Sequence, residues 1–145
     1  LEDLMQELAR QIVRDGEGAS KFVTIQISGG ASEKAARRIG LAVANSPLVK
    51  TAIAGGDANW GRVVMAVGKT GEKVDRDLLS ISMGGIPIAR KGEIIKGYDE
   101  KPVAAHLKGS EIMLEIDVGV GRGCSTVWTC DLTHDYITIN ADYRS

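Results

Sequence analysis

Three short segments of the chain carry polar side chains beside glycines, and at these places the sequence could do chemistry. Residues 16–20 read GEGAS, and the glycine on each side of Glu17 leaves its carboxylate uncrowded. Residues 55–62 read GGDANWGR, and residues 140–145 read NADYRS. The last segment brings an amide, a carboxylate, a phenol, a guanidinium and a hydroxyl close together. The three segments would form a binding site if the fold brought them together, which the sequence alone does not show.

Each segment also has a structural interpretation, which the residue types alone favour. Glu17 fits a surface turn that carries a solvated carboxylate. Asp57 and Asn59 are good N-cap residues for a following helix, and a strand, a glycine-rich turn and a helix N-terminus can together hold an anion. The segment has no GxxxxGKS/T phosphate loop, so a tight turn anchored by Trp60 is the favoured interpretation. The chain end fits a polar, well-capped last turn that closes over the core.

The cysteines and histidines do not form a disulfide or metal pattern. Cys124 and Cys130 lie in one expected strand, which separates them by roughly 20 Å, beyond disulfide reach. We therefore expect two buried free thiols and a reducing compartment. His134 alone does not supply enough ligands for a metal, and His106 lies in an expected helix without a carboxylate or cysteine partner. We expect no metal site.

The composition is that of an ordinary globular domain. The chain has 145 residues, of which 43% are hydrophobic and 26% charged, so we expect a single domain over residues 1–145. A net charge of −1 argues against nucleic-acid or anionic-membrane partners. No apolar run is long enough to cross a bilayer, and no signal-peptide pattern stands at the start, so we expect a cytoplasmic protein.

Hydrophobic periodicity predicts an α+β fold, with a mixed sheet and helices packed on one side. We expect an opening helix that ends at Asp15 and a helix after the Asp99 cap. Residues 111–120 and 124–132 should form a hairpin. The other expected elements are a strand over 21–28, a helix over 31–44, a short apolar strand over 48–54, a helix from 63, two short strands within 79–90 and an edge hairpin over 92–97.

The start of the sequence predicts a fragment. The chain has no initiator Met, and its first residues already follow a helical pattern with no capping residue before them. We therefore expect a fragment that was cut from a longer chain.

Four motifs in this order resemble the ornithine acetyltransferase family, the glutamate N-acetyltransferases of arginine biosynthesis. They are GEGASKF at 16–22, GGDANWGR at 55–62, WTCDLTH at 128–134 and INADYRS at 139–145, and together they span nearly the whole chain. Ala58 stands where the family often has Pro, and Ser145 stands where Thr is common but keeps the hydroxyl.

The resemblance implies an enzyme that transfers an acetyl group from N2-acetylornithine to glutamate. Family members cleave themselves before a Thr, which becomes the N-terminal nucleophile of the β chain. The resemblance makes this chain the C-terminal fragment of such a self-processed precursor. It places that Thr and the oxyanion hole upstream, so we expect no catalytic residue here. The implied partners are an α chain and the rest of the β chain, in an (αβ)2 heterotetramer. No cofactor is implied, and whether acetyl-CoA also serves as a donor stays open.

By motif position, the resemblance assigns substrate binding to Glu17, Asn140 and Ser145. Glu17 would pair with a substrate ammonium, and the Asn140 amide would meet a carboxylate or acetamide. Residues 57–62 remain a structural turn, and His134 and Cys130 remain structural. Two other hypotheses stay open: a non-catalytic assembly or scaffold domain, and a related self-cleaving aminopeptidase.

Overall fold

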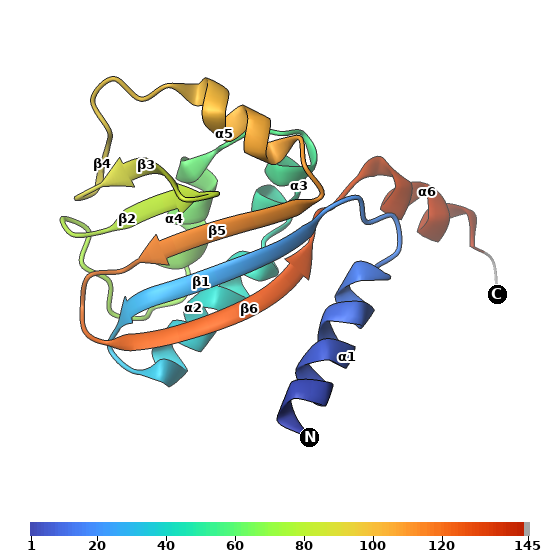
Figure 1. The fold of residues 1–145 in the computed structure, drawn as a ribbon, viewed down its shortest axis with the longest axis horizontal. Coiled ribbons are helices and arrows are strands. Elements are labelled where there is room, and N and C mark those ends of the chain that lie inside the picture. The colour runs from blue at the N-terminus through green and yellow to red at the C-terminus, as the bar shows by residue number, and fades with distance from the viewer. Residues whose placement is uncertain (144–145) are drawn as a thin grey trace.

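The computed structural model describes residues 1–143 and is built around one six-stranded mixed sheet (Figure 1). The strands lie in the order β4-β3-β2-β5-β1-β6. The strands are β1 (Phe22–Gly30), β2 (Ser80–Met83), β3 (Ile86–Arg90), β4 (Glu93–Ile94), β5 (Glu111–Asp117) and β6 (Gly123–Cys130). The helices are α1 (Glu2–Arg14), α2 (Glu33–Ala44), α3 (Pro47–Ala54), α4 (Trp60–Gly68), α5 (Glu100–Leu107) and α6 (His134–Asp142).

Strand β1 lies between β5 and β6 and pairs with both. It runs parallel to β5 and antiparallel to β6, so that Ile25 lies beside Leu114 on one side and Val127 on the other. Side chains alternate between the two faces of a sheet, and these three therefore share a face. All three are buried, and they belong to the hydrophobic core.

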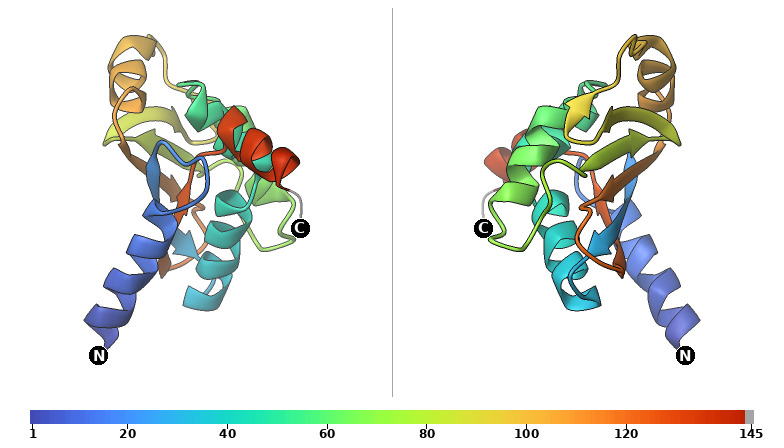
Figure 2. Two further views of the ribbon diagram at one scale, coloured as in Figure 1. Left: turned by 90° about the vertical axis from the view of Figure 1, so that its right-hand side faces the viewer. Right: turned by 90° about the vertical axis from the view of Figure 1, so that its left-hand side faces the viewer.

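Helices α2, α3 and α4 cover this apolar face, which agrees with the predicted one-sided helical layer (Figure 2). Helix α2 approaches most closely at Gly40. A Cβ at Gly40 would lie 3.1 Å from Val127 Cγ2 and 3.3 Å from Ile27 Cγ1. A larger residue at this position would push the helix off the sheet.

The opposite face of the sheet is polar and largely uncovered. Gln26 and Thr126 are exposed there, and Thr24 is half-buried. Helix α1 lies on this side of the sheet (Figure 2). Two of its arginines contact aromatic rings of the sheet. The Arg10 guanidinium carbon lies 4.8 Å from the Trp128 ring centre, and that of Arg14 lies 4.0 Å from the Phe22 ring centre. No residue of α1 is buried. Its apolar stripe, formed by Leu4, Leu8 and Ile12, is exposed and therefore faces away from the domain.

The strand predicted over 48–54 is wrong, because these residues form helix α3. The Ser46 side chain accepts a hydrogen bond from the Val49 amide, and Pro47 occupies the first turn. A Ser cap followed by Pro is a helix-start signal. It outweighed the short apolar run, which periodicity alone does not assign to a strand or a helix.

The predicted hairpin between residues 111–120 and 124–132 is also wrong, because β1 lies between β5 and β6. The glycine-rich connection passes over the end of β1 instead. The amides of Val118 and Val120 donate to Ser28 O at 3.0 Å and to Gly29 O at 2.8 Å. Gly29 has φ of 69°, and a Cβ there would lie 2.7 Å from the Gly119 amide nitrogen, so this crossing needs a glycine.

Other predictions have mixed outcomes. The α2, α5 and β2–β3 predictions are confirmed. The edge hairpin predicted over 92–97 is reduced to one strand, β4, which pairs with β3 at the edge of the sheet. Both thiols are free, but Cys124 is exposed because it points to the uncovered face, and Cys130 is only half-buried. Helix α6 does not close over the core as expected, since none of its residues is buried. Within residues 1–143, no helix has the length and apolar character needed to span a membrane.

Since the hydrophobic core lies on one face of the sheet, stability should depend mainly on that face. We predict that Leu114→Ala, which removes a fully buried side chain, lowers the free energy of unfolding by about 2–5 kcal/mol. Thr126→Ala, on the uncovered face of β6, should cost less than about 1 kcal/mol. Urea denaturation of both variants checks this, and similar losses would contradict the one-sided core.

Candidate functional site

Glu17 stands at the tip of a tight turn just before β1. The Ala19 amide donates to Gly16 O at 3.0 Å, which closes a four-residue turn with Glu17 at its second position. Gly18, at the third position, has φ of 68°, as a type II turn requires. The Glu17 side chain is exposed, so a ligand can reach its carboxylate.

The turn rests directly on the first turn of α6. A Cβ on Gly18 would lie only 2.5 Å from the Tyr136 amide nitrogen, so only glycine fits here. Thr133 precedes the helix, but its side chain does not cap it. Its hydroxyl instead donates to Gly18 O at 2.5 Å, which ties the helix start to the turn.

This contact brings Glu17 and Asn140 together, although 123 positions separate them in the sequence. Asn140 Nδ2 donates to Glu17 Oε2 at 2.9 Å and to Tyr136 O at 2.9 Å. Both partners are acceptors, so the nitrogen must face them and Oδ1 must point elsewhere. The pair is exposed and offers further acceptor oxygens, which suits a ligand that donates N–H groups.

Asp131 anchors the base of the Glu17 turn, and sequence reasoning did not identify it. Its Oδ1 accepts from the Ser20 amide at 2.8 Å and from the Lys21 amide at 2.9 Å, and its Oδ2 accepts from the Ser20 hydroxyl. Asp131 as a whole residue is 3% exposed. The only sequence signal was its position between a strand end and a Thr that precedes a helix.

The other predicted residues lie apart from this pair or outside the described structure. Ser145 falls beyond residues 1–143, so the structure does not place it. The 55–62 segment forms the predicted structural turn, although a helix, not a strand, precedes it. The Asn59 side chain accepts from the Arg62 amide at 3.3 Å, and Arg62 Nη1 donates to Leu48 O at 2.9 Å.

The two histidines have local roles. His106 Nε2 accepts a hydrogen bond from the Met113 amide at 3.1 Å, so this ring has a backbone partner that the sequence did not reveal. Its ring also lies so close to Gly84 that a Cβ there would be 2.6 Å away. His134 lines a cavity of about 360 Å³ between α3 and α6, together with Thr51 and Ile137.

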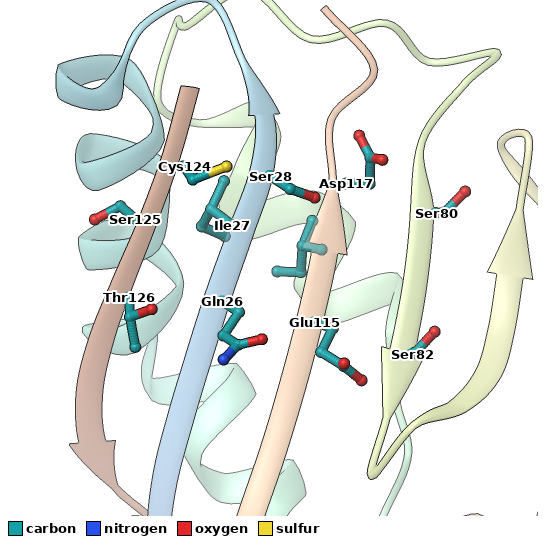
Figure 3. Close-up of a pocket in the computed structure, with 11 residues that line it drawn as sticks. Gln26, Ile27, Ser28, Ser80, Ser82, Glu115, Asp117, Cys124, Ser125 and Thr126 are labelled. Atoms are coloured by element: carbon teal, nitrogen blue, oxygen red, sulfur yellow. The ribbon is translucent and has the colours of Figure 1, made fainter. Parts of the chain in front are cut away.

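A trough of about 500 Å³, lined mostly by polar residues, lies on the uncovered face of the sheet (Figure 3). Its two carboxylates already hold turns: Glu115 Oε2 accepts from the Gly85 amide at 3.2 Å, and Asp117 Oδ1 accepts from the Gly119 amide at 2.9 Å. Cys124 also lines the trough. Across the part of the chain that the structure describes, no three His, Cys, Asp or Glu side chains form a metal-binding group.

Fold and site together define a mixed α/β domain that presents a carboxylate–amide pair beside one end of its sheet. The chain belongs to the ArgJ family, whose model matches residues 1–145. It is 63% identical over 139 residues to the "Arginine biosynthesis bifunctional protein ArgJ" of Zymomonas mobilis. The aligned segment covers 96% of this chain and 34% of that protein. The protein of the same name from Ruegeria pomeroyi is 61% identical over 145 residues, or 100% of this chain and 36% of that protein.

A solved structure shows the same fold. The crystal structure of the arginine biosynthesis bifunctional protein ArgJ from Bacillus halodurans matches with a TM-score of 0.94 and 38% identity, over 98% of this chain and 67% of that chain. This chain spans about a third of the length of the curated relatives that it matches.

The tight seat of the turn on α6 gives a matched test. We predict that Gly18→Ala destabilises the protein by about 1–3 kcal/mol more than Gly56→Ala. Both glycines have positive φ, 68° and 70°, but a Cβ on Gly56 meets nothing within 4 Å. Gly56→Ala should therefore show only the cost of a left-handed Ala, about 1–2 kcal/mol. Equal losses in urea denaturation would argue against the close contact with α6.

Proposed function

We propose that this chain is the substrate-binding part of a glutamate N-acetyltransferase, which transfers an acetyl group from N2-acetylornithine to glutamate in arginine biosynthesis. The observation that carries the proposal is the 2.9 Å contact between Asn140 and Glu17, because both residues match substrate-binding positions of the family that the sequence resembles. Membership of the ArgJ family, and relatives named for arginine biosynthesis, support the same pathway.

In this proposal the two residues recognise different groups of the substrate. The Glu17 carboxylate accepts charge-assisted hydrogen bonds from a substrate ammonium. Asn140 uses both Nδ2 hydrogens on Glu17 and Tyr136, so it offers Oδ1 as an acceptor for an amide N–H, such as that of an acetamide. Ser145 would add a hydroxyl to the same site.

The bond-making groups of the proposed reaction lie elsewhere in the whole protein. An N-terminal Thr, freed by self-cleavage, attacks the acetyl carbonyl and releases ornithine, and the amine of glutamate then attacks the resulting ester. Backbone or side-chain donors stabilise the oxyanion at each step. These groups would come from an α chain and the rest of the β chain, in an (αβ)2 assembly in the cytoplasm. The transfer needs no cofactor, and acetyl-CoA is a second candidate donor.

An assembly role is the second candidate, and one observation favours it. Leu4, Leu8 and Ile12 form an exposed stripe on α1, which Leu1 extends at the N-cap. Ile137 and Ile139 are exposed on α6. Exposed apolar stripes of this kind commonly mark protein interfaces. Removing residues 142–145 from the whole protein separates the two candidates, because loss of the oligomer with unchanged kinetics would favour assembly.

We predict that Glu17→Gln and Asn140→Ala each lower kcat/KM for acetyl transfer without lowering the thermal midpoint. A lost hydrogen bond to a charged group is worth about 1.5–3 kcal/mol, which corresponds to about 10- to 150-fold in kcat/KM. Glu93→Gln, on the exposed edge strand β4, is the control and should leave kinetics unchanged. Unchanged kinetics in both site variants would remove Glu17 and Asn140 from the site.

We also predict that the 145-residue chain alone transfers no acetyl group from N2-acetylornithine to glutamate, whereas the whole precursor does. The proposed nucleophile lies outside this chain, so product should form only when that part is present. Chromatographic detection of N-acetylglutamate in both samples checks this. Turnover by the chain alone would mean that a nucleophile lies within it, and Ser20, Cys124 and Cys130 would be the first residues to replace.

A further inference from the structure

We propose that Asp131 is a positioning residue that sets the separation of Glu17 and Asn140 for substrate, an inference that rests on the function proposed for that pair. Asp131 is the one buried charged residue among those that the structure describes, with 3% of its surface exposed. Burying a carboxylate is costly unless its oxygens are fully hydrogen-bonded. Here both oxygens have partners, and all of these partners lie at Ser20 and Lys21.

Asp131 and the two residues after it connect three parts of the domain. The Asp131 amide donates to Lys21 O at 3.2 Å, which extends the pairing of β1 and β6. The Leu132 amide donates to Lys50 O at 3.3 Å, on α3. The Thr133 hydroxyl then donates to Gly18 O. Residues 131–133 therefore hold the base of the Glu17 turn, the body of the domain and the start of α6.

Apolar burial does not hold the two site residues in place. Helix α6 buries no residue, and Glu17 itself is exposed. A second hydrogen bond connects the segment before β1 to α3, because Lys21 Nζ donates to Ile53 O at 2.8 Å near the C-terminus of that helix. The polar contacts around Asp131 thus replace the apolar burial that usually fixes a loop and a helix. Losing them should change the spacing of the pair before it unfolds the core.

The matched variants differ in which hydrogen bonds they keep. Asp131→Ala leaves the Ser20 and Lys21 amides without their acceptor. In Asp131→Asn, the amide oxygen can still accept from both, and its nitrogen can donate to the Ser20 hydroxyl. Ser20→Ala removes only the hydroxyl contact. Asn therefore serves as the conservative rescue, and Ser20→Ala is the mild variant if Asp131→Ala fails to fold.

The kinetic test uses the whole protein and N2-acetylornithine. We expect Asp131→Ala to raise KM at least about 10-fold with kcat within about 3-fold, and Asp131→Asn to restore KM to within about 3-fold of the original. In an Asn140→Ala background, Asp131→Ala should raise KM no further, because both changes disable the same pair. If Asp131→Ala does not fold, Ser20→Ala takes its place. It should raise KM about 3-fold in the otherwise unchanged protein and should not raise KM in the Asn140→Ala variant. The inference would be overturned if the KM increases of Asp131→Ala and Asn140→Ala multiplied in the double variant. It would also be overturned if Asp131→Asn did not restore KM.

A structural readout separates this inference from the proposed function. We expect a crystal structure of Asp131→Ala, or of Ser20→Ala, to show Glu17 Oε2 more than 3.5 Å from Asn140 Nδ2, compared with 2.9 Å here. An unchanged contact would overturn the positioning role whatever the substrate is. If Glu17→Gln and Asn140→Ala leave KM unchanged while the contact still opens, the proposed function fails and the positioning role of Asp131 survives without a substrate.

Discussion

The pairing of β1 along both of its edges is the constraint on which the rest of the structure depends. Because β6 runs antiparallel to β1, the segment that enters β1 lies beside the segment that leaves β6. Phe22 is therefore opposite Cys130, and the Glu17 turn lies next to the start of α6. A single strand pairing thus brings residues from the two ends of the chain into one site.

The domain is held together in two different ways. Its core is an apolar layer between one face of the sheet and helices α2–α4, where Ile25, Ile39 and Leu114 have no exposed surface. The site lies outside this layer and is fixed by hydrogen bonds to a buried carboxylate and by a glycine with no room for a side chain. Burial is insensitive to direction, whereas hydrogen bonds fix distance and angle. A polar framework is therefore well suited to hold a carboxylate and an amide at a set spacing.

Local pattern predicted the elements that have a strong period. The alternation of Val23, Ile25 and Ile27 marked β1, and the same pattern marked β5. It failed where two signals competed, as at residues 48–54, where the Ser46–Pro47 cap outweighed an apolar run. Local pattern also failed for strand pairing, which depends on the whole fold. A glycine-rich connection does not reveal whether the two strands that it joins pair with each other or lie on either side of a third strand.

For the candidate site too, sequence motifs identified some residues, whereas their contacts depend on the tertiary structure. Family motifs pointed to Glu17 and Asn140, but only the position of β6 shows that they meet. Asp131 was missed because nothing in its neighbours marks a carboxylate that will be buried, and tertiary donors decide that burial. His106 likewise found its partner in a backbone amide of β5, which no side-chain motif encodes.

Strand β6 has a consequence for the handling of this chain. It is the last strand of the sheet, and no strand among the described residues pairs with its outer edge. Its sequence, GCSTVWTC, has no charged residue and no proline, the features that natural edge strands use to block pairing with other molecules. Arg10 of α1 lies over the Trp128 ring, but it belongs to another element and is not a charge on the strand itself. The outer edge of β6 is therefore the place where intermolecular β-sheet pairing is expected when this chain is concentrated.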